Sequence, residues 1–474
     1  MGVLVGNTKL TIFWTYHTDP QTYVWSRIEV ALRKTSSRCW PAIFPIFNIE
    51  VDPRNMQTNK ALPLMSIYFT IAIVFHTHAT TFYVDAVNGN DLNSGTEKSR
   101  PWKSIKKVNE AVFSPGDSIC FKKGGTWTGQ LDIRYSGTTE KPIMFTSYGI
   151  GAKPVIQNPG VHNGSAISIL ADWIIVEGFL VRETHQAGIS IKKGADHNIV
   201  RDNEATLAGM GIGVTGRYNL VVNNFSHDLT MITNTPGGDD DYGAVGIWLF
   251  GSNNEIAYNR MLNCAAPSHD YGRDGGMVEF YGDVDSCYVH HNWGENCNGA
   301  FEVGGKGETL TDNVIAYNVS INNLVSGGFH LGGKFGVILE RFLVENNVFV
   351  DLGTRDYTIG LWRGSPAPVD IQYRNNIFYI PNHTKAMNQA GAVHEHNLYY
   401  MGGKTNIGVP LGKGERIGDP LFVSLKNQNF HLQPQSVAID AGARLQHSKD
   451  YDGRIVPFGS SADMGAYEYQ NARR

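Results

Sequence analysis

The sequence predicts an all-β solenoid, a fold in which short strands stack into successive coils. Glycine accounts for 53 of the 474 residues, and because it shows no collagen period this excess indicates many tight turns. Segments between residues 188 and 376 repeat one pattern of short strand, glycine turn, short strand and asparagine. The hydrophobic content of 42% is sufficient for a large core, which excludes a chain that is mainly disordered.

Seven segments carry the repeat. They read GISIKKGADHNIVRDN, GIGVTGRYNLVVNN, GIWLFGSNNEIAYN, MVEFYGDVDSCYVHHN, FEVGGKGETLTDNVIAYN, FHLGGKFGVILERFLVENN and LWRGSPAPVDIQYRNN. The interval between them varies, because insertions enter at one corner while the strands keep their length. Such a repeat is typical of a solenoid in which each coil contacts only its neighbours.

An asparagine closes every repeat and should form a structural ladder. These residues are Asn203, Asn224, Asn259, Asn292, Asn318, Asn347 and Asn376. Asparagine tolerates left-handed backbone geometry and hydrogen-bonds within its own turn. Stacked coils would let each side chain bond to the next, so we assign these residues no chemistry.

The two ends of the repeat region carry recognisable motifs. The start reads FYVDAVNGNDLNSGTEKSRPWKSIKKVNEAV, in which Ile105, Val108 and Val112 fall on one helical face suited to covering the first coil. The end includes GDPLFVSLKNQNFHLQPQSVAIDAG. With the repeats, these motifs resemble right-handed parallel β-helix proteins of the pectate-lyase-like class over about 80–470. The resemblance implies a single right-handed parallel β-helix with an N-terminal capping helix, but it specifies the reaction poorly.

The N-terminal region reads as a secretory signal. Lys60 supplies a positive start, residues 61–75 form an apolar stretch too short to span a bilayer, and residues 77–79 resemble a cleavage site. We therefore expect translation to begin at Met56 and the protein to be secreted, to the extracellular space or the periplasm. The expected organisation is an upstream leader at 1–55, a signal peptide at 56–79, the β-helix at 80–400, and closing coils with a C-terminal cap at 401–474.

The charge balance limits the partners. A formal net charge of −4 argues against a protein that relies on phosphate contacts, so no nucleic acid is expected. No membrane association is expected once the signal is removed. The expected partner is a polysaccharide or oligosaccharide, the expected state is a monomer, and no cofactor is required.

Strand alternation predicts which residues point out of the coils. Large apolar residues such as Val278 and Phe280 must face the interior, so Glu279 between them faces outward. Carrying this rule from coil to coil gives one exterior row. The row is Ser190, Gly213, Trp248, Glu279, Glu302, His330 and Trp362.

The centre of this row predicts a sugar-cleaving site. Like charges on neighbouring strands are destabilising, so a purely structural surface has no reason to stack Glu279 on Glu302. Paired carboxylates about 5–5.5 Å apart are the arrangement of retaining glycosidases. We assign Glu279 as nucleophile, Glu302 as general acid/base and His330 as an orienting group, although the two glutamates could exchange roles. Merely solvated charges, paired with nearby cations, are the structural alternative.

Residues around the row supply candidate substrate contacts. The aromatic residues Trp248 and Trp362 would offer stacking platforms at its two ends. Insertions before two strands, GGDDDYGAVG and SHDYGRDGG, would wall a groove. The remaining candidate substrate contacts are Tyr242, Asp270, Asp274, Lys306 and Arg363. Because Ca²⁺ prefers carboxylate oxygens, Asp239, Asp240 and Asp241 are candidate calcium ligands, with a solvated turn as the alternative.

Three functions remain open. The first is a retaining glycoside hydrolase, similar to some β-helix xylosidases that place two acidic residues on adjacent coils. The second is a polysaccharide lyase acting by β-elimination, in which Lys306, Lys334, Arg363 or His330 and bound Ca²⁺ would neutralise a uronate and remove a proton. The third is a non-catalytic solenoid for glycan binding or adhesion.

The cysteines indicate no metal site. Cys264 and Cys297 should stack in neighbouring coils, either as a disulfide or as buried thiols.

Overall fold

The computed structural model describes residues 79–470, except 306, 324–328, 332–336, 357, 362–368 and 388–391, and two strands near the N-terminus. The chain divides into two compact units, Met1–Phe75 and His76–Arg474. In the first unit, β1 (Lys9–His17) pairs antiparallel with β2 (Tyr23–Ala31). The apolar stretch of the expected signal peptide lies outside the described residues.

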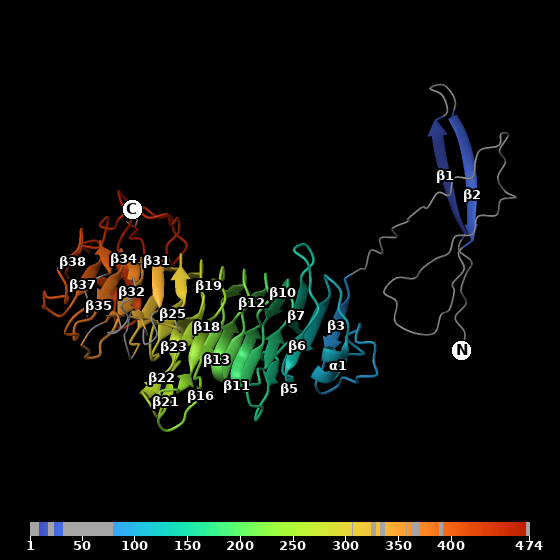
Figure 1. Ribbon diagram of the computed structural model, residues 1–474, viewed down its shortest axis with the longest axis horizontal. Helices are drawn as coiled ribbons and strands as arrows, with labels where there is room; N and C mark the ends of the chain where they lie inside the picture. Colours follow the sequence, from blue (N-terminus) through green and yellow to red (C-terminus); the bar gives the residue numbers. More distant parts are fainter. Residues whose placement is uncertain are drawn as a thin grey trace. The chain divides into compact units, whose positions relative to one another are not determined.

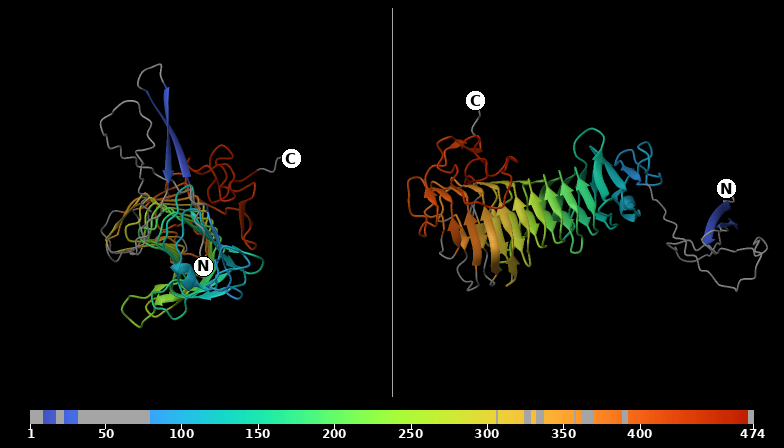
Figure 2. Two further views of the ribbon diagram at one scale, coloured as in Figure 1. Left: turned by 90° about the vertical axis from the view of Figure 1, so that its right-hand side faces the viewer. Right: turned by 90° about the horizontal axis from the view of Figure 1, so that it is seen from above.

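The second unit is a parallel β-helix whose coils carry strands on three faces (Figures 1 and 2). The face that carries the predicted exterior row, called face A, pairs its strands in parallel from coil to coil. Its strands are β6 (Leu131–Ile133), β9 (Ile167–Ile169), β11 (Leu180–Ile191), β13 (Glu204–Val214), β18 (Val245–Leu249), β23 (Gly276–Tyr281), β26 (Phe301–Gly304), β30 (Phe329–Leu331) and β33 (Gly360–Leu361). β11 and β13 are long because each bends around a corner from another face.

The second face, called face B, is a 13-stranded sheet. Its strands are β3 (Thr81–Val84), β4 (Ser118–Lys122), β7 (Ile143–Tyr148), β10 (Ile174–Glu177), β12 (Ile199–Arg201), β14 (Leu220–Val222), β19 (Glu255–Ala257), β24 (Tyr288–His290), β27 (Thr309–Thr311), β28 (Val314–Ala316), β31 (Ile338–Glu345), β34 (Val369–Arg374) and β36 (Val393–Glu395).

The third face, called face C, begins with β5 (Thr126–Thr128) and β8 (Val155–Gln157), includes the first parts of β11 and β13, and continues to β38 (Arg416–Ile417). Its other strands are β15 (Phe225–His227), β20 (Arg260–Leu262), β25 (Trp293–Glu295), β29 (Val319–Ile321), β32 (Val348–Val350), β35 (Ile377–Tyr379) and β37 (Leu398–Tyr400). Three antiparallel pairs decorate the solenoid: β16 (Met231–Thr233) with β17 (Tyr242–Gly243), β21 (Ala266–Ser268) with β22 (Gly272–Asp274), and β39 (Phe422–Ser424) with β40 (Asn429–Leu432).

The interior of the coils is a continuous apolar core, as the inward residues of the repeat predict. Aromatic rings stack along the axis within it. The rings of Phe349 and Phe378 are 5.0 Å apart, and those of Phe378 and Tyr399 are 5.3 Å apart. Each coil therefore buries its apolar face against its neighbours, which is how a solenoid gains stability.

The asparagine ladder is confirmed. Asn224 Nδ2 donates to Asn259 Oδ1 at 3.0 Å, and the same bond recurs from coil to coil up to Asn397. The left-handed residue, however, is the one before the ladder position, such as Tyr258 with a φ of 55°. The ladder side chains are buried and satisfy backbone carbonyls, so their role is structural.

A short helix, α1 (Ile105–Glu110), lies at the first coils, and the Ser104 hydroxyl caps it by accepting from the Lys107 N–H at 3.1 Å. Ile105 and Val108 are buried, as expected. The expectation for Val112 is wrong, because it follows the helix and is 71% exposed.

The C-terminal segment does more than close the coils. Residues after β38 run back along face C, on the opposite side of the solenoid from the β16–β17 and β21–β22 hairpins (Figures 1 and 2). Gln428 Nε2 donates to Glu295 at 2.8 Å, and Asn346 donates to the Gly465 carbonyl at 3.0 Å. A second apolar cluster, which includes Phe422, forms between this segment and face C. No helix in the described part of the chain is long and apolar enough to cross a bilayer.

Candidate functional site

The exterior row of face A has the register that strand alternation predicts. Trp248 pairs with Glu279, Glu279 with Glu302, and Glu302 with His330. The next member of the row is Gly360, which pairs with His330. The prediction that Trp362 lies beside His330 was therefore wrong. Trp362 itself lies outside the described residues.

The two glutamates face outward because their strand neighbours anchor the interior. Val278 and Phe280 flank Glu279 and are fully buried, and so are the two neighbours of Glu302. Both glutamates are partly buried. Burial, followed by the charges of Glu302 and Asp274, holds the pKa of Glu279 well above its usual range.

A glycine makes room for the Glu279 carboxylate. Gly276 lies three residues earlier on the same strand, and a Cβ built there would come within 2.8 Å of Glu279 Oε1. The side chain of Glu279 therefore folds back over the bare Cα of Gly276. Any larger residue at 276 would displace the carboxylate.

Trp248 is a support for the site and does not form an exposed platform. Its side chain faces out of the coil as predicted, but it is only 7% exposed. It packs with Met210 and Ile232, and the ring of Tyr242 lies edge-on at 5.7 Å. The β16–β17 hairpin thus covers Trp248, which corrects its predicted role as a stacking surface.

Two aromatic residues that the sequence reading missed lie next to the row. Phe250 and Tyr281 are partly exposed, and their ring centroids are 6.0 Å apart. Tyr281 pairs with Gly304, and its ring covers that glycine, with ring carbons 3.0 and 3.2 Å from a built Cβ. Alternation could have found both, because each lies two positions after a member of the row.

The two insertions, which were expected to wall a groove, contact each other. Asn234, after β16, donates to the Pro267 carbonyl of β21 at 3.0 Å, and its own Oδ1 accepts from the His269 N–H at 3.1 Å. Tyr242 from the first hairpin is 37% exposed and lies against Trp248. Asp274 ends β22 close enough to Glu279 to raise its pKa.

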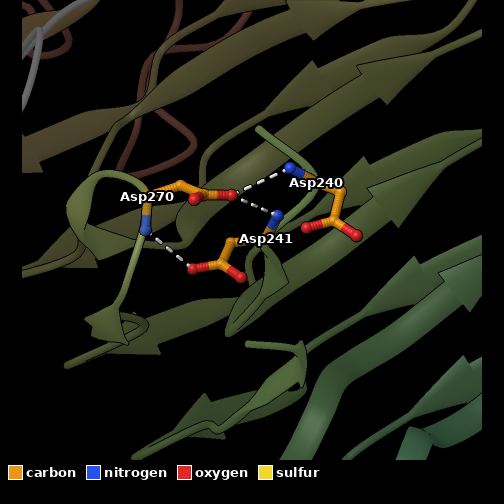
Figure 3. A group of neighbouring side chains, drawn as sticks. All are labelled: Asp240, Asp241 and Asp270. Carbon is orange, nitrogen blue, oxygen red and sulfur yellow. Dashed lines mark hydrogen bonds between the residues drawn. The ribbon is translucent and has the colours of Figure 1, made fainter. Parts of the chain in front are cut away.

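Three aspartates lie together between the hairpins, but they are not the three that were predicted (Figure 3). Carboxylate oxygens of Asp240, Asp241 and Asp270 lie within 4.8 Å of one another. Asp270 Oδ2 accepts from the Asp240 N–H at 2.9 Å and from the Asp241 N–H at 3.3 Å. Asp239 instead accepts from the hydroxyl of Tyr271 at 2.8 Å, so the metal role assigned to it is not supported by this geometry.

Hydrogen bonds already account for much of this acidic cluster. Asp241 accepts from the Ser268 hydroxyl at 2.7 Å, the Asp270 N–H at 3.0 Å and the Thr235 N–H at 2.7 Å. Burial alone would raise the pKa of Asp241, but these bonds outweigh it and lower the pKa to about 2. These hydrogen bonds tie the two hairpins together, and calcium binding there stays a prediction.

Tyr271 is a further residue that the sequence reading did not select. Its hydroxyl donates to Asp239, and its pKa is raised by burial first and then by nearby carboxylates, including Asp274 and Glu302. The Asp- and Tyr-rich composition of the second insertion was the available signal.

Several predicted residues lie outside what the structure describes. These are Lys306, Lys334, Trp362 and Arg363, while His330 is placed by its backbone register alone. Of the two open predictions for the cysteines, the structure shows the second, because Cys264 and Cys297 are free and buried.

The fold and the site define the class of protein. Residues 82–337 match the family described as Pel9A-like, right handed beta helix region, more than half of the chain, so the chain belongs to this family. The expected right-handed parallel β-helix is thereby confirmed. The crystal structure of pectate lyase Pel9A has a TM-score of 0.60 with 18% identity, covering 83% of this chain and 97% of that one. XylC in complex with xylose has a TM-score of 0.54 with 11% identity, covering 82% and 98%.

Two curated relatives match shorter stretches. Over 88 residues the chain is 40% identical to the lacto-N-biosidase of Bifidobacterium longum subsp. longum, which is 17% of this chain and 6% of that protein. Over 128 residues it is 27% identical to the uncharacterized protein YwoF of Bacillus subtilis, 24% of this chain and 26% of that protein. The chain thus spans about a quarter or less of either relative. The low identities to the solved structures show a shared fold alone.

Proposed function

We propose that this protein is a secreted carbohydrate-active enzyme, and specifically a retaining glycoside hydrolase that uses Glu279 and Glu302. The single observation that carries the proposal is the direct pairing of these two outward glutamates on neighbouring parallel strands. Paired strands lie about 4.8 Å apart, which suits the short carboxyl separation that retention requires. The similar proteins, a pectate lyase, a xylose complex and a lacto-N-biosidase, support a carbohydrate substrate.

The electrostatics favour a division of roles opposite to the first assignment from sequence. Burial and the charges of Glu302 and Asp274 raise the pKa of Glu279, which favours its protonated form. We therefore assign Glu279 as the proton donor and Glu302 as the nucleophile.

Each step then follows from these two roles. Glu279 gives its proton to the glycosidic oxygen while a Glu302 oxygen attacks the anomeric carbon, so the carbon–oxygen bond to the leaving group breaks and a glycosyl ester forms. Glu279, now ionised, takes a proton from water as the water attacks the same carbon. The ester bond breaks, Glu302 leaves as a carboxylate, and the sugar keeps its configuration.

The decisive experiment is incubation of the protein with a panel of plant and microbial glycans. New reducing ends without unsaturation support the proposal, and binding without turnover contradicts it. Glu279→Gln and Glu302→Gln should each lower kcat at least about hundredfold, whereas Glu340→Gln, an exposed glutamate on face B, should be neutral. Full activity in either of the first two variants removes the mechanism.

Azide separates the two roles. With an activated aryl glycoside, Glu302→Gly should yield a glycosyl azide of inverted configuration, because azide enters from the side that the nucleophile vacated. Glu279→Gly should yield an azide of retained configuration, because the ester still forms. The opposite pair of products restores the first assignment.

A polysaccharide lyase is the second candidate, and membership of the Pel9A-like family favours it. A lyase needs cationic groups near a uronate, whereas the described centre of the row is acidic. Unsaturated, UV-absorbing products from a uronate polymer would establish the lyase and exclude the hydrolase.

Secretion rests on the expected signal peptide. We propose that the mature chain begins near Ala79, after the apolar stretch 61–75. N-terminal sequencing of the exported protein tests this, and a mature start well before Thr80 contradicts it.

A further inference from the structure

A cleft lies on the other side of the solenoid from the glutamate row. It has a volume of about 300 Å³ and is lined by Tyr258, Asn259, Arg260, Trp293, Gln428 and Tyr451. The first four residues come from the corner between faces B and C, and the last two come from the C-terminal segment that runs back along face C (Figure 1). Because Glu279 is on face A, the cleft is separate from the proposed active site.

The cleft is lined by aromatic side chains that the fold does not require at these positions. Tyr258 is 45% exposed and occupies the left-handed turn position that precedes each ladder asparagine, where asparagine and aspartate are the residues that fit best. Trp293 is held by Phe430 with ring centroids 5.9 Å apart, and Tyr451 lies edge-on to it at 6.3 Å. Fixed rings on three sides offer flat apolar surface at little entropic cost.

The polar groups of the cleft are donors held in place. Gln428 is tied through its Nε2 to Glu295 at 2.8 Å. The guanidinium of Arg260 lies over the ring of Phe225 at 5.4 Å, and among the described residues no carboxylate forms an ion pair with it. Its N–H groups are therefore available to a ligand.

We propose that this cleft is an accessory binding site for a neutral sugar unit of an oligosaccharide. The apolar face of a sugar ring would pack on Trp293 and Tyr258, and its hydroxyls would accept from Arg260 and Gln428. A neutral sugar is favoured over a uronate because the carboxylates near the cleft outnumber the one cation in its lining. After burial, Glu255 and Asp450 raise the pKa of Tyr258 and Asp452 raises that of Tyr451, whereas Arg260 alone lowers the pKa of Tyr451. The negative charge of a uronate would therefore be repelled.

The proposal is tested on the full chain with the active site disabled by Glu279→Gln and Glu302→Gln. The protein is labelled with 5-fluorotryptophan, and Trp293→Phe identifies the fluorine signal of Trp293. Xylohexaose, cellohexaose and mannohexaose are titrated as neutral probes, and trigalacturonate serves as the acidic probe. We expect the Trp293 signal to shift and saturate at millimolar concentration with at least one neutral probe, and to stay in place with trigalacturonate.

Paired variants identify the residues responsible. Tyr258→Ala with Arg260→Ala should weaken the binding at least about tenfold. Arg217→Ala with Tyr218→Ala removes the same residue types from the exposed turn between β13 and β14 and should leave the affinity unchanged. A silent Trp293 signal with all three neutral probes, equal binding of trigalacturonate, or unchanged affinity in the first pair overturns the proposal. Hydrolysis by the glutamate pair is measured separately on the unmodified enzyme, so either result can fail without the other.

Discussion

The carboxylate of Glu279 lies over the bare Cα of Gly276, three residues earlier on the same strand. A Cβ at Gly276 would come within 2.8 Å of Glu279 Oε1. The neighbour that would have to move is the flexible end of a side chain, so the chain would fold around the substitution. The position of the proposed proton donor would nevertheless change.

Gly276→Ala should therefore separate activity from stability. We expect kcat/KM to fall about tenfold to hundredfold, because a displacement of about 1 Å at a reacting group has costs of this order. The melting temperature should change little. Gly418→Ala is the matched control, because its Cβ would meet its nearest neighbour at an ordinary 3.4 Å. Equal activity in both variants would show that Glu279 does not need its present position.

Asp274 should set the alkaline limit of activity. Its charge helps to raise the pKa of Glu279, after burial and the charge of Glu302. Asp274→Asn removes that charge, so the pKa of Glu279 should fall and Glu279 should lose its proton at lower pH. We expect the alkaline limb of the kcat/KM profile to move to lower pH.

The control for this profile is Asp283→Asn, a charge removal at an exposed turn after β23. Asp283→Asn should leave the acid and alkaline limbs of the kcat/KM profile at the same pH as in the wild type. A Glu279 that acts only as an ionised nucleophile predicts the opposite for Asp274→Asn: the acid limb would move to lower pH and the alkaline limb would stay.

Trp248 should behave as a packing residue. It is 7% exposed, and its Nε1 has no hydrogen-bond partner among the described residues. Trp248→Phe therefore removes packed side-chain volume but breaks no hydrogen bond. We expect the free energy of unfolding to fall by about 1–3 kcal/mol, with KM for a short oligosaccharide nearly unchanged. Urea unfolding measures the change in the free energy of unfolding, and steady-state kinetics measure KM. A large rise in KM without loss of stability would restore the stacking role.

Strand alternation placed the glutamate pair correctly because both partners sit between large apolar residues. An outward glutamate at 279 follows from the burial of Val278 and Phe280, and a slip by one residue would have exposed both. The same rule failed two coils after Glu302, beside His330, for an identifiable reason. Gly360 pairs with His330, and Trp362 is two positions further along the sequence. Alternation assigns residues two positions apart to the same side, so it cannot choose between them.

The sequence pattern could not predict how exposed each outward side chain is or how the two hairpins fold over the row. Alternation gives the side on which Trp248 lies, but its burial depends on Tyr242 and Ile232, which an insertion folds back over it. The acidic cluster likewise depends on contact between two insertions, which places Asp270 where Asp239 was expected. Only tertiary packing determines such contacts.

The asparagine ladder should be costly to interrupt. Asn224 is buried and donates to the Val200 carbonyl at 2.8 Å and to Asn259 Oδ1 at 3.0 Å, while it accepts from the Asn203 N–H at 3.0 Å. Asn224→Ala leaves these groups without partners inside the protein, at about 1–3 kcal/mol for each unsatisfied group. We expect the free energy of unfolding to fall by about 3 kcal/mol or more.

A ladder variant needs a control that removes one asparagine bond near the surface. Asn382→Ala serves, because Asn382 is exposed and its side chain donates to the Leu352 carbonyl at 2.7 Å. Its cost should stay below about 1 kcal/mol. Chemical unfolding measures both, and equal costs would mean that the ladder adds nothing beyond single hydrogen bonds.

His291 should make the contact with the C-terminal segment sensitive to acid. Its Nε2–H donates to the Asp450 carbonyl at 2.8 Å, and burial, with the nearby His290 and His447, lowers its pKa to about 4. Between the unfolded pKa near 6.5 and the folded value, only the unfolded chain binds the proton. Stability is therefore fully present above pH about 6.5 and is lost as pH falls towards 4, by about 3 kcal/mol in total.

His291→Asn tests this contribution, because asparagine accepts the left-handed backbone at this position, where φ is 55°. The buried Asp463 opposes the trend, since burial raises its pKa to about 7 and its proton stabilises the fold towards acid. The informative quantity is thus the difference between the two proteins in the pH dependence of the unfolding free energy. We expect the wild type to lose about 3 kcal/mol more than His291→Asn between pH 6.5 and 4, and His269→Asn, an exposed control, to follow the wild type. Parallel curves for wild type and His291→Asn would show that His291 binds its proton as readily in the folded chain as in the unfolded one.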